Sequence, residues 1–352
     1  MNANEVIANR ALELMGHHKG EYQFCHPNNH INLAQSTNDA YPTAAKLGIC
    51  LSTEALITEL ERLIASFRDK GTAFGGHIKM GRTQLQDAVP MTLGQEFESY
   101  AASLENEVPY MRQAASGLLE INMGATAIGT GINSDPAYAD LVTKRLAEIS
   151  GYPVRKAQNL IAATNDTTDF VSYSGQLKRL AVKISKICND LRLLASGPRA
   201  GLNEISLPPM QPGSSIMPGK VNPVIPEVMN QVCFRVIGND TAVMMASEAG
   251  QLELNVFEPV MIYSILESIA ILKNGMATLR QRCIDGIEAN VERCKELAYR
   301  SIGLVTALNP VLGYETSSDI AKTALQTNRS VYDLVLERGL LSKDALDEIL
   351  TP

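Results

Sequence analysis

The 352-residue sequence lacks a concentration of positive charge. Its 31 Lys and Arg residues stand against 38 Asp and Glu, the formal net charge is -7, and the chain contains no basic block. Binding to nucleic acid depends on clustered cations that neutralise phosphates. We therefore expect no nucleic-acid partner.

Long apolar runs are missing as well. No run approaches the roughly 18 residues that cross a bilayer, and no signal peptide opens the chain. The sequence thus predicts a cytoplasmic protein without a membrane partner. Its 45% hydrophobic and 20% charged content is ordinary for a globular fold with a large core.

Cysteine pairs and histidine clusters are scarce, and there is no Trp. None of the six cysteines forms a Cys-x-x-Cys pair, so we interpret them as reduced thiols, several of them in the core. His26 and His30 are four residues apart, but Pro27 lies between them and a turn is the favoured interpretation. The glycine-rich segment 124–131 lacks the spacing of a dinucleotide site. We predict no metal site and no cofactor.

Helical periodicity is the strongest signal in the chain. Apolar residues recur every three to four positions over long stretches, which is typical of helices that bury one face in a bundle. No alternating strand pattern of more than a few residues is evident, so the predicted fold class is all-α. The four stripes are Leu56, Leu60, Leu63 and Phe67; Leu93, Phe97, Tyr100, Leu104, Val108, Met111 and Leu118; Leu177, Leu180, Ala181, Ile184, Ile187, Cys188, Leu191 and Leu194; and Val256, Val260, Tyr263 and Leu266.

Glycine and proline mark where these helices stop. The stretch from Gly213 to Pro223 contains too many of both to form a regular helix, and 224–249 then reads as a helix. From about Val291 the helices shorten to 317–327, 330–338 and 342–350, the last two with serine N-caps. This predicts a small C-terminal helical subdomain.

Four polar clusters interrupt the helical pattern, at 35–39, 81–90, 203–204 and 213–223. The first can be read simply as the cap of a helix that starts near Thr43, and the second as a polar connection before a helix at Thr92. No Gly-x-Ser-x-Gly elbow is present, and a Ser-His-Asp triad has no support in the sequence. What remains is a set of neutral donors together with Lys220. Such a set suits a small dicarboxylate.

Three of these clusters resemble the motifs of the aspartase/fumarase superfamily: Gly213-Ser-Ser-Ile-Met-Pro-Gly-Lys-Val-Asn-Pro223, Gln35-Ser-Thr-Asn-Asp39 and Gly81-Arg-Thr-Gln-Leu-Gln-Asp87. The similarity extends over essentially the whole chain. Within the superfamily the details are similar to aspartate ammonia-lyases: 224–232 continues as in that branch, Glu258 stands where fumarases typically have lysine, and Thr37 stands where they commonly have serine. Gln84 stands where fumarases and some aspartate ammonia-lyases have histidine.

The resemblance implies a long-helix bundle of the aspartase/fumarase type, divided into a remnant of an N-terminal domain at 1–37, a central bundle at 38–290 and a small helical domain at 291–352. It also implies a homotetramer whose sites combine motifs from three subunits. Because 1–10 resembles the end of a motif found about a hundred residues into full-length members, an N-terminal domain is expected to be missing. His26–Asn29 is similar to a secondary dicarboxylate site of fumarases.

The resemblance further implies the reversible removal of ammonia from L-aspartate, with a role for each motif residue. Ser214 would be the base, with the backbone N–H groups of Ile216 and Met217 stabilising its alkoxide. The alternatives are a fumarate hydratase, another lyase of the superfamily, or a non-catalytic fragment or structural protein of the same fold. The other roles are hydrogen-bond donation to one carboxylate by Ser36, Thr37 and Ser215, binding of the second carboxylate by Lys220 and Asn222, and contact with the amino group by Asn38, Thr83 and Gln84.

Overall fold

The computed structural model describes residues 2–214 and 216–350, and the chain divides into two compact units. Each unit collects three separate parts of the chain. Unit 1 comprises Met1–Ala55, Pro109–Lys178 and Val236–Ala270, and unit 2 comprises Leu56–Val108, Arg179–Arg235 and Ile271–Pro352.

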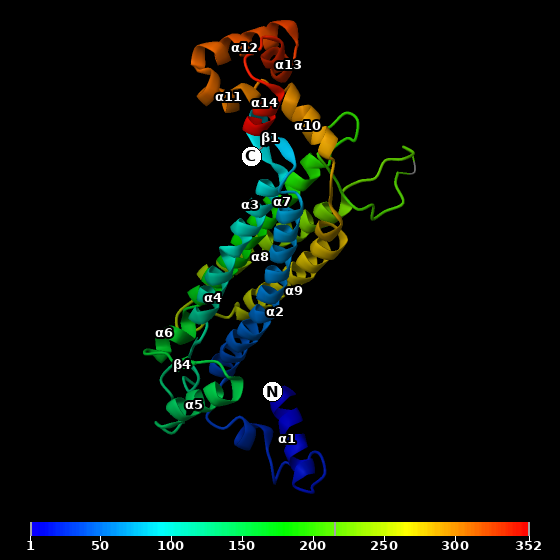
Figure 1. Ribbon diagram of the computed structural model, residues 1–352. Helices are drawn as coiled ribbons and strands as arrows, with labels where there is room; N and C mark the ends of the chain where they lie inside the picture. The colour runs from blue at the N-terminus through cyan, green and yellow to red at the C-terminus, as the bar shows by residue number, and fades with distance from the viewer. Residues whose placement is uncertain (1, 215, 351–352) are drawn as a thin grey trace. The chain divides into compact units, whose positions relative to one another are not determined.

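Long helices dominate the fold, as the periodicity predicts (Figure 1). The four longest are α2 (Thr37–Ala73), α7 (Thr168–Leu194), α8 (Val224–Glu248) and α9 (Glu258–Arg282). The all-α fold class is confirmed. The remaining helices are α1 (Asn2–Leu14), α3 (Leu93–Glu105), α4 (Glu107–Gly117), α5 (Tyr138–Ser150), α6 (Leu160–Asn165), α10 (Val291–Arg300), α11 (Leu304–Leu312), α12 (Tyr314–Thr327), α13 (Val331–Glu337) and α14 (Lys343–Leu350), with a π-helical turn at Pro27–Ile31 and a 3-10 turn at Ile284–Gly286.

In unit 1, buried polar contacts join neighbouring long helices. The hydroxyls of Thr53 on α2 and Tyr173 on α7 are 2.5 Å apart, and Ser174 donates to Asp240 on α8 at 2.9 Å. Asn239 on α8 donates to the Ser268 hydroxyl on α9 at 3.0 Å. Polar groups buried between helices need such partners, and the contacts fix the register of the four helices in this unit.

In unit 2, the same helices meet through other pairs. Arg280 on α9 donates to Glu59 on α2 at 3.1 Å, and Asn230 on α8 donates to the Ser185 hydroxyl on α7 at 2.9 Å.

Three of the four predicted stripes are buried, including every residue of the α7 stripe from Leu177 to Leu194. The six cysteines are buried and unpaired, as expected.

The stripe predicted from Val256 to Leu266, which overlaps the start of α9, is wrong. Val256, Val260 and Tyr263 are 69%, 46% and 64% exposed, whereas Met261 and Ile265 are fully buried. The helix is apolar on most of its surface, so its periodicity does not mark the inward face. The expectation that no segment approaches membrane-spanning length also needs correction. A window within Glu258–Gly286 has a mean hydropathy of 1.3, so this segment is long and apolar enough to cross a membrane. The core helix of a bundle meets the same criteria of length and composition.

Strands are more prominent than expected, because the polar connection predicted at 81–90 is a β-hairpin. β1 (Ile78–Thr83) pairs antiparallel with β2 (Gln86–Thr92), so Thr83 lies opposite Gln86 across a two-residue turn. Thr92 then caps α3 by accepting from the Gln95 backbone N–H. The remaining strands are short: β3 (Glu120–Ile121) pairs parallel with β4 (Arg155–Lys156), and β5 (Ile205–Ser206) pairs antiparallel with β6 (Glu288–Ala289).

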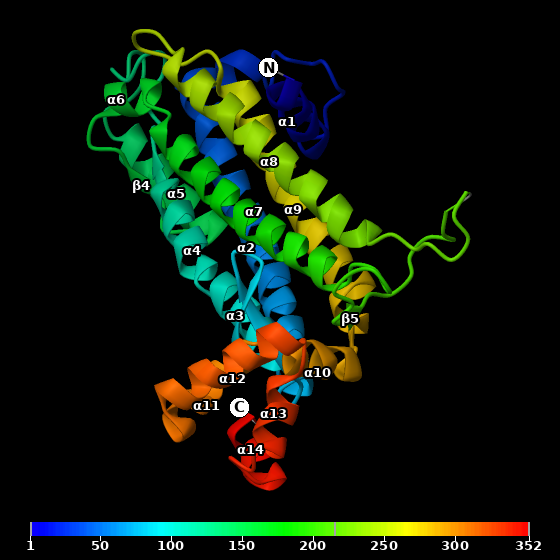
Figure 2. The ribbon, with the colours of Figure 1, turned by 90° about the horizontal axis from the view of Figure 1, so that it is seen from above.

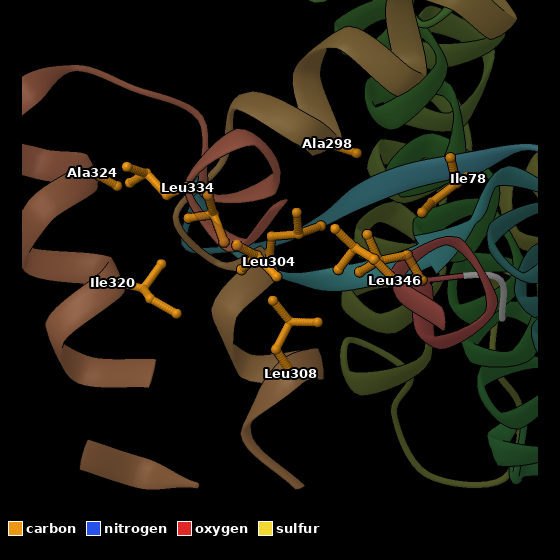
Figure 3. Packing of buried hydrophobic residues seen from close by; sticks show 11 residues of the cluster. Ile78, Ala298, Leu304, Leu308, Ile320, Ala324, Leu334 and Leu346 are labelled. Atoms are coloured by element: carbon orange, nitrogen blue, oxygen red, sulfur yellow. The ribbon is translucent and has the colours of Figure 1, made fainter. Parts of the chain in front are cut away.

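The C-terminal helices share a core with this hairpin. Ile78 on β1 belongs to the same buried cluster as Leu304, Ile320 and Leu346 (Figure 3). The predicted serine caps are confirmed. Ser330 accepts from the Asp333 backbone N–H at the start of α13, and Ser342 accepts from Ala345 at the start of α14.

Candidate functional site

The first motif cluster forms the N-terminus of α2 in unit 1. The helix begins at Thr37, six residues before the predicted start near Thr43. Ser36 Oγ accepts from the Asn38 backbone N–H at 3.2 Å, and Asp39 accepts from the Ser36 backbone N–H at 2.9 Å. This reciprocal capping explains why a helix can start there.

Pro42 lies inside α2 and is the reason that the sequence predicts a later helix start than the structure has. Proline has no N–H, so it leaves the carbonyl one turn earlier, at Asn38, without its helical partner. Asn122 supplies a replacement by donating to the Asn38 carbonyl at 3.0 Å. A contact with a residue distant in sequence therefore allows a helix that the local sequence disfavours.

Asp39 binds the first cluster to the glycine-rich segment that follows α4. Its carboxylate is fully buried and accepts from the backbone N–H groups of Gly124 at 3.2 Å and Thr126 at 2.9 Å. Burial raises the pKa of Asp39, and the backbone hydrogen bonds oppose that rise. The Asn38 side chain donates to the Ala127 carbonyl at 2.8 Å. Ser36 and Asn38 are thus held in place, while Thr37 is exposed.

The second cluster, in unit 2, lies at the tip of the β1–β2 hairpin. Thr83 and Gln84 are exposed there. Gln84 and Leu85 form the turn with φ of 53° and 61°, a backbone region that costs an L-residue roughly 1–2 kcal/mol. Strain of this kind persists only where the surrounding structure imposes it.

The third cluster, also in unit 2, lies on the segment between β5 and α8, where the described residues form neither helix nor strand (Figure 2). Ser214 Oγ accepts from the backbone N–H of Ile216 at 3.3 Å and of Met217 at 3.1 Å. These are the contacts that the resemblance led us to expect. Ser214 also donates its backbone N–H to the Lys220 carbonyl at 3.1 Å, which closes the loop. Ser215 lies outside the described residues.

Lys220 and Asn222 lie together on the wall of a cleft of about 560 Å³ in unit 2. Arg192 on α7 and Asn203 and Ser206 near β5 line the same cleft. Among the described residues, Thr83 and Gln84 are not part of this lining. The cleft offers two cations, two amides and the hydroxyls of Ser196 and Ser206, which suit a carboxylate ligand, alongside one acidic side chain, Glu227.

Sequence reasoning missed a cluster of buried charges beneath the hairpin. Lys79 and Glu204 are 2% and 0% exposed, and Arg82 pairs with Glu204 at 3.0 Å. The pair Asn203-Glu204 stood out as polar but had no assigned role. The available signal was a lysine and an arginine three residues apart just before a polar turn.

The residues described by the structure contain no group of three or more His, Cys, Asp or Glu side chains able to hold a metal ion. One buried acid stands apart from the three clusters: Glu258, at the start of α9 in unit 1. Burial raises its pKa to about 7, against the opposing charge of Lys46.

Comparison with known proteins covers almost the whole chain. The model of the family described as Lyase matches residues 1–238, and that of the fumarase C C-terminus matches residues 304–352. An aspartate ammonia-lyase from Pseudomonas aeruginosa is 62% identical over 100% of this chain and 74% of that protein.

Solved structures agree with these matches. A fumarate lyase:delta crystallin from Brucella melitensis, bound to cobalt, has a TM-score of 0.95 at 56% identity, covering 99% of this chain and 76% of that one. A class II fumarase from Schistosoma mansoni has a TM-score of 0.88 at 34% identity, covering 99% of this chain and 76% of that one. The chain therefore belongs to the lyase family that includes the aspartate ammonia-lyases and the class II fumarases.

Proposed function

We propose that this chain catalyses the reversible deamination of L-aspartate to fumarate and ammonia. The observation that carries the proposal is the 62% identity to an aspartate ammonia-lyase over the whole chain, against 34% to a class II fumarase. The three polar clusters supply the donors and the cation that a dicarboxylate substrate needs.

In the proposed mechanism, Ser214 removes a proton from the carbon next to the side-chain carboxylate. The electron pair of that C–H bond moves into the carboxylate and gives an enediolate. The electron pair then moves back from the enediolate to form the C–C double bond, while the C–N bond breaks and ammonia leaves. The contacts from Ile216 and Met217 support this role, because two N–H donors stabilise a serine alkoxide.

The enediolate needs hydrogen-bond donors that act as its charge develops. We assign this role to Ser36, Thr37 and Ser215. Lys220 and Asn222 hold the other carboxylate, and their shared position in one cleft supports the pairing.

The amino group is assigned to Asn38, Thr83 and Gln84. Gln84 has no titratable group, so it orients the amine by hydrogen bonding alone. Its place in a strained turn at an exposed tip supports a binding role.

We further propose a cytoplasmic homotetramer in which the three clusters of one site come from three subunits, with 291–352 as a small helical domain that packs on the β1–β2 hairpin. An exposed apolar face on α8 and α9 in unit 1 supports assembly, since such faces mark contacts between proteins. That face comprises Met244 and Met245 on α8 and Val260 and Tyr263 on α9.

The test of this function is fumarate formation, followed by ultraviolet absorbance, from L-aspartate and from L-malate in parallel. We expect kcat/KM for L-aspartate to exceed that for L-malate by at least about 100-fold. A preference for L-malate identifies a fumarate hydratase instead. Activity on neither substrate rejects the proposal. Light scattering of the same sample tests the tetramer.

A further inference from the structure

Four charged side chains form a group at the base of the β1–β2 hairpin in unit 2, of which Lys79 and Glu204 are buried and Arg82 and Glu96 are partly buried. Glu204 is its centre. Arg82 Nη1 lies 3.0 and 3.1 Å from the two carboxylate oxygens of Glu204, and Lys79 Nζ lies 3.2 Å from one of them. Lys79 also pairs with Glu96 on α3 at 2.6 Å. Two cations thus face two anions.

Removing one member of such a group leaves an uncompensated buried charge, so its geometry is tightly fixed. Glu204 is fully buried, and Arg82 and Lys79 both reach it from β1. Arg82 directly precedes Thr83 and lies opposite Asp87 across the hairpin. The carboxylate of Glu204 therefore holds the strand that ends at the tip bearing Thr83 and Gln84.

The backbone of Glu204 is anchored just as firmly on its other side. Its N–H donates to the Leu194 carbonyl at the end of α7, and its carbonyl accepts from the Asn290 N–H, both at 2.9 Å. Its chain neighbours Asn203 and Ile205 line the cleft that contains Lys220 and Asn222. Glu204 thus joins the hairpin to the wall of the cleft.

We propose that Glu204 is a positioning residue, which fixes the hairpin tip carrying Thr83 and Gln84 on the fold of its own subunit. The inference rests on the proposed function for the roles of Thr83 and Gln84. The connection itself is a property of the fold and is testable without activity.

The kinetic test is Glu204→Gln, which keeps the shape of the side chain but turns an acceptor of charged donors into a neutral amide. Misplacement of an orienting group by about 1 Å costs up to about 100-fold in rate. We therefore expect kcat for L-aspartate to fall about 10- to 100-fold, with KM changing by less than about 3-fold, because orientation for departure of the amine acts in the transition state.

Glu107→Gln is the matched control. Glu107 is also fully buried in unit 2 and pairs with two cations, Arg179 at 3.1 Å and Lys183. Both variants should lose thermal stability, since each removes a buried anion from two cations. Only Glu204→Gln should lower kcat. Equal kinetic effects from the two variants overturn the proposal.

Hydrogen–deuterium exchange supplies the readout that does not depend on catalysis. In Glu204→Gln the amides of residues 84–87 should exchange at least about 10-fold faster, and in Glu107→Gln they should not change, because exchange reports local opening. If the unaltered chain fails to deaminate L-aspartate, the proposed function falls, while the exchange comparison still decides the role of Glu204.

Arg82→Lys is the second variant, needed where Glu204→Gln does not fold. It keeps the positive charge and removes the two-oxygen contact with the carboxylate. We expect the same selective loss of kcat and faster exchange at 84–87, in smaller degree. Unchanged kcat and unchanged exchange in Arg82→Lys overturn the proposal.

Discussion

The hairpin tip at Thr83 and Gln84 is anchored by buried charges, whereas the hydrogen bonds described for the loop from Gly213 to Pro223 join residues of the loop itself and the first turn of α8. Arg82, next to the tip, reaches the fully buried Glu204. In the loop, Ser214 bonds to Lys220, and Lys220 bonds back to Met217. Both segments belong to unit 2, and both carry proposed site residues.

The difference indicates two ways of supplying catalytic groups. A group that orients the substrate is most effective when its position is set in advance, and the hairpin tip has such support. A group that must exclude water is better placed on a segment that moves. Gly213 and Gly219 have φ of 94° and 82°, a backbone region open to glycine, and they border the part of the loop that bears Ser214. We infer that this loop closes over bound substrate.

The largest effect is expected when the Ser214 hydroxyl is removed from the loop. Ser214→Ala should lower kcat by about 1,000-fold or more, the range of a lost proton-transfer group, while fumarate still binds. Ser116→Ala, which alters an exposed serine on α4, is the control and should keep full activity. Near-normal turnover in Ser214→Ala would show that Ser214 is not the base.

Glu258 lies outside both the hairpin and the loop, so its substitution should change the free energy of unfolding without affecting either segment. Burial raises the pKa of Glu258 from 4.5 to about 7, so the folded state binds more protons between those values and stability falls as pH rises from about 4.5 to 7. Glu258→Gln should therefore be more stable than the unaltered chain at pH 8, by on the order of 3 kcal/mol, with little difference at pH 4. Urea unfolding at both pH values measures this, and parallel pH profiles for the two proteins contradict it.

Lys220 tests what the loop contributes to binding. Lys220→Met should weaken binding of L-aspartate by about 30-fold, equivalent to about 2 kcal/mol, because one carboxylate loses its countercharge. The KM for L-aspartate and the affinity for fumarate, measured by calorimetry, should change together. Lys343→Met, at an exposed lysine on α14, should leave both unchanged. A KM within twofold of normal in Lys220→Met places the lysine outside the site.

The smallest expected effect concerns the strain in the hairpin tip. Leu85 has φ of 61° and is 70% exposed, so Leu85→Gly should stabilise the protein by about 0.5–1 kcal/mol, the relief of strain less the entropy cost of glycine. Leu252→Gly is the match in unit 1, with φ of 57° and 84% exposure. Both should raise the midpoint of urea unfolding. A fall in the midpoint for Leu85→Gly means that the turn is not strained.

Helix periodicity predicts most of the fold where one face of a helix is clearly apolar. The α7 stripe is correct in every residue because polar residues fill most of the positions between its apolar ones, with Val182 and Leu193 as the exposed exceptions. The α9 stripe is wrong because Met261 and Ile265, which are buried, alternate with the equally apolar Val260 and Tyr263, which are exposed. Composition alone cannot choose between two apolar faces.

The hairpin and the start of α2 escaped prediction for a different reason. Two-residue hairpin turns are recognised by Gly, Asn or Asp, and here the turn is Gln84-Leu85. The α2 helix depends on Asn122, more than eighty residues from the carbonyl it satisfies. The motifs identify Ser214 and Lys220, but the role of Glu204 emerges only when its partners from β1 are placed around it.

If the hairpin is preset and the loop closes, the two segments should respond differently to a bound ligand. Hydrogen–deuterium exchange of the unaltered chain, with and without saturating fumarate, measures both responses in one experiment. We expect amides 216–222 to exchange rapidly in the free protein and at least about 10-fold more slowly with fumarate, and amides 82–87 to exchange at the same slow rate in both states. Slow exchange of the loop without ligand, or ligand-induced protection of the hairpin equal to that of the loop, would contradict this expectation.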